Sequence, residues 1–171
     1  MFEDTAKGME ALGVVFKNTY LFEAFDKDGN LKWSEEISNL VTTAGLNDVL
    51  DKYLKGSNYT AAWFAGLKGA GAPAAADTMA SHAAWAEVTQ YDEAARPALA
   101  FGTPSNGAVS ATQVTFTINA TVTIAGGFIT SSGTKGGSTG VLYGVANFAS
   151  NRDLVDNDEL RVTHTVSMAS M

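Results

Sequence analysis

The chain has 171 residues, a formal net charge of −7 and no cysteine. A chain of this length predicts one domain, whose core is large enough to fold without a disulfide or a structural metal. The negative charge argues against nucleic acid as a partner, because nucleic-acid binders concentrate Lys and Arg on one surface. The lack of cysteine excludes disulfides, thiol catalysis and thiolate zinc sites.

The N-terminus and the apolar runs indicate where in the cell the protein is expected. The first seven residues, MFEDTAK, are acidic and mixed, unlike the basic and then apolar layout of a secretory signal. No apolar run approaches the roughly 20 residues that an α-helix needs to span a bilayer. We therefore expect a soluble protein that is made in a cytoplasm and has no membrane partner.

The composition of the chain changes near Gly56. Most of the lysines and more than half of the acidic residues precede this glycine, whereas Ala, Thr, Gly and Val dominate after it. We interpret residues 1–56 as an N-terminal arm with a hairpin and a helix, and residues 57–171 as a β-sandwich domain.

The first part contains a predicted β-hairpin. Residues 14–25 are rich in aromatic and β-branched side chains, and residues 30–37 alternate between apolar and polar. The sequence DKDGN at residues 26–30 is a strong turn signal between them.

One short helix is predicted after the hairpin. Thr42 or Thr43 can cap its N-terminus, and Gly56 is well placed to end it. The apolar residues between them follow helical spacing: Leu46, Val49, Leu50, Tyr53 and Leu54.

The second part reads as short strands separated by turns. The clearest alternation is at residues 114–124, where every second residue is apolar, as expected for an antiparallel sheet with one buried face. The predicted strands are residues 60–67, 86–91, 96–101, 113–118, 121–130, 141–148 and 160–168. The pattern predicts a mainly β fold, an antiparallel β-sandwich that is jelly-roll-like, with the N-terminal hairpin and one short helix. Residues 77–82 are compatible with a single helical turn.

The two histidines, His82 and His164, lie far apart in sequence, and neither has metal-ligand spacing. We place His164 on the polar face of the last strand, opposite Val162 and Val166. We expect both histidines to face solvent or to be hydrogen-bonded.

Two acidic segments resemble cation sites. Residues 26–30 look like the opening of a calcium loop, but an EF-hand needs glycine in place of Leu31 and glutamate in place of Ile37. An acidic cluster precedes the last predicted strand: Asp153, Asp156, Asp158 and Glu159. We interpret both segments as solvated turns and predict no metal site.

Catalytic patterns are also weak. There is no Gly-x-Ser-x-Gly elbow, and the loop at residues 133–140 lacks the ending of a phosphate-binding loop. Glu35 and Glu36 are sequence neighbours, as are Asp92 and Glu93, so neither pair makes an acid–base site by itself. We predict a non-enzymatic protein with no catalytic residue, no cofactor-binding residue and no cofactor.

Five phrases, taken in order, resemble a known family. They are FDKDGNLKW (25–33), NLVTTAGLNDVLD (39–51), DTMASHAAW (77–85), YDEAARP (91–97) and GFITSSGTKGG (127–137). The series is similar to small virion structural proteins of tailed bacteriophages, and most of all to the capsid decoration, or cement, proteins of short-tailed phages. The resemblance runs from about residue 21 to the C-terminus.

The resemblance implies a jelly-roll-like domain on the exterior of the capsid in the virion, with the major capsid protein as its partner and no catalytic residues. We expect it to stabilise the shell by bridging capsid subunits, as a homodimer or trimer. The alternative is a tail or fibre-associated module that binds a receptor or glycan through an exposed Trp63 or Trp85. Core packing is the simpler role for these two residues and for Trp33.

The N-terminal arm carries aromatic residues that it cannot bury alone: Phe2, Phe16, Tyr20, Phe22 and Phe25. We therefore expect it to pack on the main domain or on a neighbouring chain. On this interpretation, removal of residues 1–20 weakens attachment to the particle and leaves the β domain folded.

Overall fold

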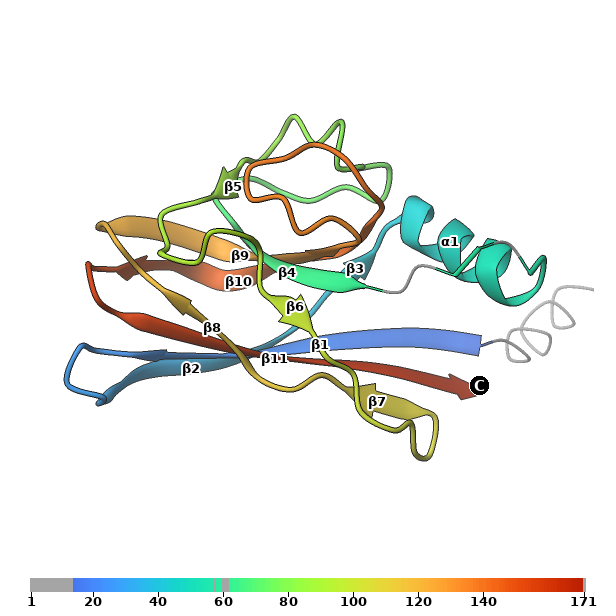
Figure 1. The fold of residues 1–171 in the computed structure, drawn as a ribbon, viewed down its shortest axis with the longest axis horizontal. Helices are drawn as coiled ribbons and strands as arrows, with labels where there is room; N and C mark the ends of the chain where they lie inside the picture. The colour runs from blue at the N-terminus through green and yellow to red at the C-terminus, as the bar shows by residue number, and fades with distance from the viewer. Residues whose placement is uncertain (1–13, 57, 60–61, 171) are drawn as a thin grey trace, which may run out of the picture.

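The computed structural model describes residues 14–56, 58–59 and 62–170, which form two antiparallel sheets packed face to face (Figure 1). The five-stranded first sheet has the order β2-β1-β11-β7, with β8 also paired to β11. The six-stranded second sheet has the order β3-β10-β9-β4-β5, with β6 also paired to β4. The prediction of a mainly β antiparallel sandwich with an N-terminal hairpin and one short helix is confirmed.

The first sheet contains β1 (Val14–Phe25), β2 (Leu31–Ser38), β7 (Ala108–Ser110), β8 (Val114–Thr117) and β11 (Glu159–Ser170). The second contains β3 (Leu40–Val41), β4 (Trp63–Lys68), β5 (Glu87–Val88), β6 (Ala98–Leu99), β9 (Val122–Thr130) and β10 (Leu142–Leu154). The hairpins β1–β2 and β9–β10 each stay within one sheet, and the chain changes sheet between β10 and β11. The helix α1 (Thr43–Tyr53) lies at one end of the sandwich (Figure 1).

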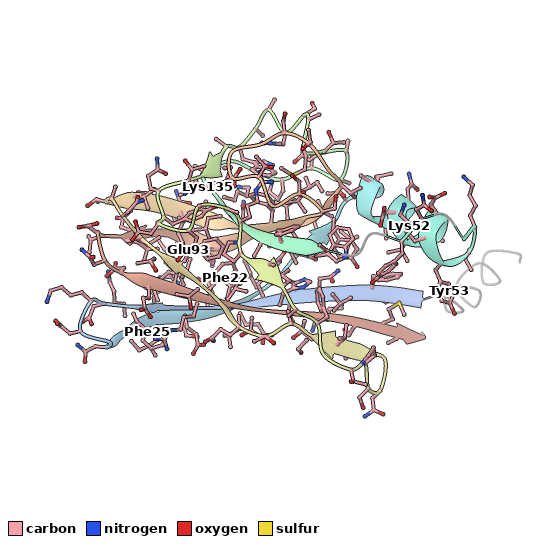
Figure 2. All side chains as sticks on the ribbon, viewed as in Figure 1. Phe22, Phe25, Lys52, Tyr53, Glu93 and Lys135 are labelled. Carbon is pink, nitrogen blue, oxygen red and sulfur yellow. The ribbon has the colours of Figure 1, made fainter. Side chains whose placement is uncertain are left out.

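Strand β1 is an inner strand of the first sheet. It pairs with β11 along its full length, from Val14 opposite Ser170 to Phe25 opposite Glu159, and its other edge pairs with β2. Alternate side chains of β1 point into the sandwich, so Tyr20 and Phe22 are buried in the main core. Figure 2 shows Phe22 between the two sheets.

The packing places no domain boundary at Gly56. The main core contains residues from both sides of this glycine, including Phe22 of β1 and Leu160 of β11. This corrects the interpretation of residues 1–56 as an arm beside a separate domain, at least for residues 14–56; Phe2 lies outside the described residues. Removal of residues 1–20 would delete the part of β1, residues 14–20, that pairs with residues 164–170 of β11, so we expect it to destabilise the sandwich.

The hairpin turn and the helix cap form as predicted. The Asp26 carboxylate accepts hydrogen bonds from the backbone N–H groups of Asp28 and Asn30, both at 2.9 Å, and Gly29 adopts φ +84°. The hydroxyl of Thr42 accepts a hydrogen bond from the Gly45 N–H at 3.1 Å, which caps α1. The helix ends at Tyr53, with Gly56 just beyond it at φ +76°.

Other local predictions need correction. The predicted strands at 86–91 and 96–101 shrink to the two-residue strands β5 and β6, and residues 60–61 lie outside the described residues. The helical turn proposed for residues 77–82 is wrong, because the backbones of Thr78 and Ser81 exchange hydrogen bonds at 2.9 and 3.2 Å in a tight reversal. Strands β3 and β7 and the distal half of β10 were not predicted.

Replacement of Phe22 by Ala tests whether the hairpin belongs to the core. The Phe22 ring packs edge-on against Phe148 of β10, with ring centroids 4.8 Å apart, and it is fully buried. We expect the variant to lose about 3 to 5 kcal/mol of unfolding free energy, in a single shifted transition. Urea unfolding followed by circular dichroism measures this loss.

The matched control is Leu31→Ala, because Leu31 lies in the same hairpin and is 56% exposed. Its expected effect is within about 0.5 kcal/mol. An unchanged main transition in Phe22→Ala would show that the hairpin is an independent arm after all.

Candidate binding site at one end of the sandwich

A pocket of about 490 Å³ opens at the end of the sandwich where α1 lies. Its walls come from α1, from both sheets and from the loop between β6 and β7. Most of the lining is apolar or aromatic and includes Val49, Tyr53, Trp63, Phe101, Tyr143 and Val166, with His164 among them.

Local packing explains why α1 frames this pocket. The helix has a glycine, Gly45, where it meets β10, and a side chain there would lie 2.4 Å from the Tyr143 carbonyl oxygen. Only a residue without a Cβ allows so close an approach. The Tyr143 ring in turn packs against Trp63 of β4, with centroids 5.2 Å apart. The wall of the pocket is therefore fixed by contacts between α1, β10 and β4.

His164 is buried, which corrects the expectation that it faces solvent. Residues two apart in a strand point to the same side, so His164 shares the inward face of Val162 and Val166. Its ring is 1% exposed and lies 4.8 Å from the Tyr20 ring and 5.9 Å from the Phe101 ring. Neither ring nitrogen has a hydrogen-bond partner in the described part of the chain.

The surroundings of His164 keep it neutral. Burial in this apolar environment lowers the pKa of His164 to about 3. At neutral pH the imidazole is therefore uncharged, with one nitrogen that can donate a hydrogen bond and one that can accept it.

His82 lies elsewhere, so the structure does not bring the two histidines together. Its ring stacks on Trp85 at 4.0 Å, and its Nδ1 lies 2.9 Å from the Trp85 carbonyl oxygen. The expectation of a hydrogen-bonded histidine is confirmed at this position. His82 and Trp85 line a second pocket, of about 530 Å³, beside the loop at Gly136.

The predicted acidic cluster lies in and beside the turn before β11, and its best-buried member, Asp158, stabilises that turn. Asp158 is buried, accepts a hydrogen bond from the Val155 N–H at 2.8 Å and forms an ion pair with Lys32 at 2.5 Å. Asn157 adopts φ +67°, as a turn at this point requires. Asp153 accepts a hydrogen bond from Thr123 instead. Across the described residues, no three His, Cys, Asp or Glu side chains are grouped to hold a metal.

The neighbouring carboxylates also have structural partners. Glu35 pairs with Arg152 at 2.7 Å, which links the edges of the two sheets. Glu93 accepts hydrogen bonds from the backbone N–H and the hydroxyl of Thr117 at 3.0 to 3.2 Å. Glu36 is exposed and points away from Glu35, as alternation in a strand requires.

Sequence reasoning missed Arg96, which holds the glycine-rich loop. Its buried guanidinium pairs with both oxygens of Glu87, at 2.8 and 2.7 Å, and donates to the carbonyl oxygens of Ser132 and Gly137, at 2.8 Å each. The loop at residues 133–140 is therefore an anchored structural element. The proximity of Arg96 to this loop is a tertiary contact and leaves no local sequence signal.

The three tryptophans are buried or half-buried. Trp85 is buried, and its indole N–H donates to Asp77 at 2.9 Å. Trp33 is half-buried between Phe148 and the Arg152 guanidinium. Trp63 is half-buried in the wall of the first pocket.

Exposed apolar side chains gather at the same end of the molecule. Leu46 and Leu50 of α1 and the C-cap residue Leu54 are exposed at intervals of four residues, a spacing that forms one stripe. Leu54 is 73% exposed, and Tyr53, at the tip of the helix in Figure 2, is 85% exposed. We call Leu46, Leu50, Tyr53 and Leu54 the helix patch.

Comparison with protein-family models and with curated proteins found no match to this chain. Within the described residues, no helix is long and apolar enough to cross a membrane.

The pKa of His164 predicts an acid-labile fold. The unfolded chain has a histidine pKa of about 6.5. Because the folded pKa is lower, the unfolded state binds the proton first as the pH falls, and stability is lost from about pH 6.5 towards pH 3. We expect the free energy of unfolding of wild type to fall relative to His164→Leu by about 2 to 3 kcal/mol between pH 7.5 and pH 4.5.

Urea unfolding of both proteins across this pH range measures the difference. Asp48 and Lys52 line the same pocket in both proteins, so the comparison isolates the change at residue 164. Parallel stability curves for the two proteins would contradict the buried, neutral state of His164.

Proposed function

We propose that this chain is a structural protein of a tailed-bacteriophage virion, which binds the outer surface of the capsid and stabilises the shell by bridging subunits of the major capsid protein. The observation that carries the proposal is the helix patch, a stripe of large apolar side chains left in contact with solvent. Such a patch on a soluble domain marks a surface that another protein covers. The resemblance of residues 21–171 to decoration proteins supplies the partner.

Several acidic side chains form hydrogen bonds or ion pairs within the fold, which supports a structural role over a catalytic one. Glu35, Glu93 and Asp158, three of the acidic residues considered above, are bound to Arg152, Thr117 and Lys32. Carboxylates committed to the fold are poorly placed to transfer protons to a substrate. In the proposed mechanism, the protein contributes interface area between neighbouring capsid subunits, which raises the barrier to opening of the shell.

The helix patch is a better contact surface than the edge of the first sheet. The outer strand β2 presents Lys32, Glu35 and Glu36, and charged residues on an edge strand oppose pairing with another chain. We therefore propose contact through the helix patch and not through strand addition at β2. Self-association as a dimer or trimer would place several patches on one lattice, where avidity amplifies modest contacts.

The alternative, a tail or fibre module that binds a glycan or receptor, rests on Trp63 in the wall of the first pocket. This tryptophan is half-buried and packs against Tyr143. Densitometry of purified particles separates the two functions. A decoration protein is present at a copy number on the order of hundreds, because it follows the symmetry of the shell, whereas a tail module is present at about a dozen.

Charge placed on the helix patch tests the proposed contact. We expect Leu50→Asp and Leu54→Asp each to lower the occupancy of the protein on phage heads that lack it by about tenfold or more. The reason is that a leucine contributes about 1.5 to 3 kcal/mol when it is buried, and an unpaired carboxylate resists burial. Cosedimentation of purified protein with such heads measures the occupancy.

The control is Val155→Asp, because Val155 is also exposed but lies in the turn between β10 and β11, at the other end of the sandwich (Figure 1). Its occupancy should match that of wild type, and all three variants should keep the circular dichroism spectrum of the folded protein. Normal occupancy of both helix variants would rule out the helix patch as the contact.

A further inference from the structure

The first pocket contains a polar group that the fold does not use. His164 lines this pocket, is 99% buried and has two ring nitrogens without partners. The adjacent Tyr20 ring lies 4.8 Å from it, but the Tyr20 hydroxyl accepts a hydrogen bond from the Asn39 side chain at 3.0 Å and donates to the Gly144 carbonyl at 3.4 Å. Asn18, two positions before Tyr20 on β1, is also buried and has no hydrogen-bond partner for its amide group among the described residues. A buried polar group left unpaired is costly, so its retention here points to a ligand that completes it.

The walls of the pocket favour a flat apolar ring. Trp63, Tyr143 and Phe101 present aromatic surface to it, and Val166 lies one inward-facing position along β11 from His164. Aromatic side chains prefer ring partners in tilted or offset geometry. A volume of about 490 Å³ lies within the range of small-ligand pockets and exceeds the space that one ring needs.

The number of polar groups limits the polarity of the ligand. Lys52 and Asp48 also line the pocket, but they lie 4.0 Å apart and interact with one another. Burial raises the pKa of Tyr143, so its hydroxyl stays protonated and adds no charge. Among the described lining residues, His164 alone has buried side-chain nitrogens without a partner. A sugar with several hydroxyls would leave most of them unpaired here.

We propose that this pocket binds an uncharged aromatic ring with one hydroxyl group, a phenol, whose hydroxyl forms a hydrogen bond with His164. A hydroxyl both donates and accepts, so it satisfies the imidazole whichever nitrogen carries the proton. The same chemistry occurs in free phenols and in the tyrosine side chain of another chain. This inference does not rest on the proposed virion function.

Titration of the full-length protein with p-cresol and with toluene tests the proposal, because the two probes share a ring and differ by the hydroxyl. We expect saturable binding of p-cresol with a Kd of about 1 mM or below, and about 5- to 10-fold weaker binding of toluene. Nitrogen chemical shifts of the His164 imidazole should move with p-cresol and not with toluene. This readout uses the wild-type protein and needs no variant.

Two variants locate the effect. His164→Leu removes an unpaired buried group and should fold; it should bind both probes about equally. His82→Leu, at the second histidine, should keep the wild-type preference. The proposal is overturned if p-cresol does not saturate, if the two probes bind wild type equally, or if the preference survives in His164→Leu. It is also overturned if the nitrogen chemical shifts of the ligand-free protein show an imidazole already hydrogen-bonded to water, and these shifts do not change when p-cresol is added.

A capped Gly-Tyr-Gly peptide separates the two sources of the phenol. Saturable binding of the peptide with the same imidazole shifts supports the proposal and assigns the ligand to a tyrosine side chain. Binding of p-cresol without binding of the peptide supports the proposal and assigns it to a free phenol.

Discussion

The antiparallel pairing of the first and last described strands is the constraint on which the rest of this structure depends. Strands β1 and β11 pair along twelve positions, although almost the whole chain separates them in sequence. Their inward-facing residues, including Phe22 and Leu160, form one wall of the main core. Because these contacts are non-local, the hairpin gains its packing only when the C-terminal strand is in place. The N-terminal segment is thus part of the sandwich.

The same pairing creates the pocket. Strands β1 and β11 continue towards the end where α1 lies, beyond the point at which the second sheet covers them fully (Figure 1). The alternation of β11 keeps directing His164 and Val166 inward there, so these side chains face the space below the helix. Gly45 sets the distance of the helix from β10. The regular alternation of β11 and the spacing set by Gly45 therefore both shape the first pocket.

Local signals predicted local structure. The turn at residues 26–30, the cap at Thr42 and the alternation at 114–124 each act through neighbours in sequence, and each appears in the fold. The boundary at Gly56 was wrong because the composition of the chain changes there, while residues from both sides of it pack in one core. His164 was misplaced because its polar character was given more weight than its spacing from Val162 and Val166. The ion pair of Arg96 with Glu87 was out of reach, since it depends on how two loops meet.

The helix patch and the pocket share α1, so the two proposed sites are not independent. Leu50 and Leu54 point outward, whereas Val49 and Tyr53 line the pocket, and Tyr53 remains mostly exposed at its mouth. A partner that covers the outer face of the helix must also border this mouth. A ring bound against Tyr53 would then meet both the sandwich and the partner. Differential contact of this kind is what couples two binding events, and the coupling is reciprocal. A ligand of the pocket would thus change the affinity of the domain for its partner. The size of this change would depend on how far Tyr53 contacts both the ligand and the partner.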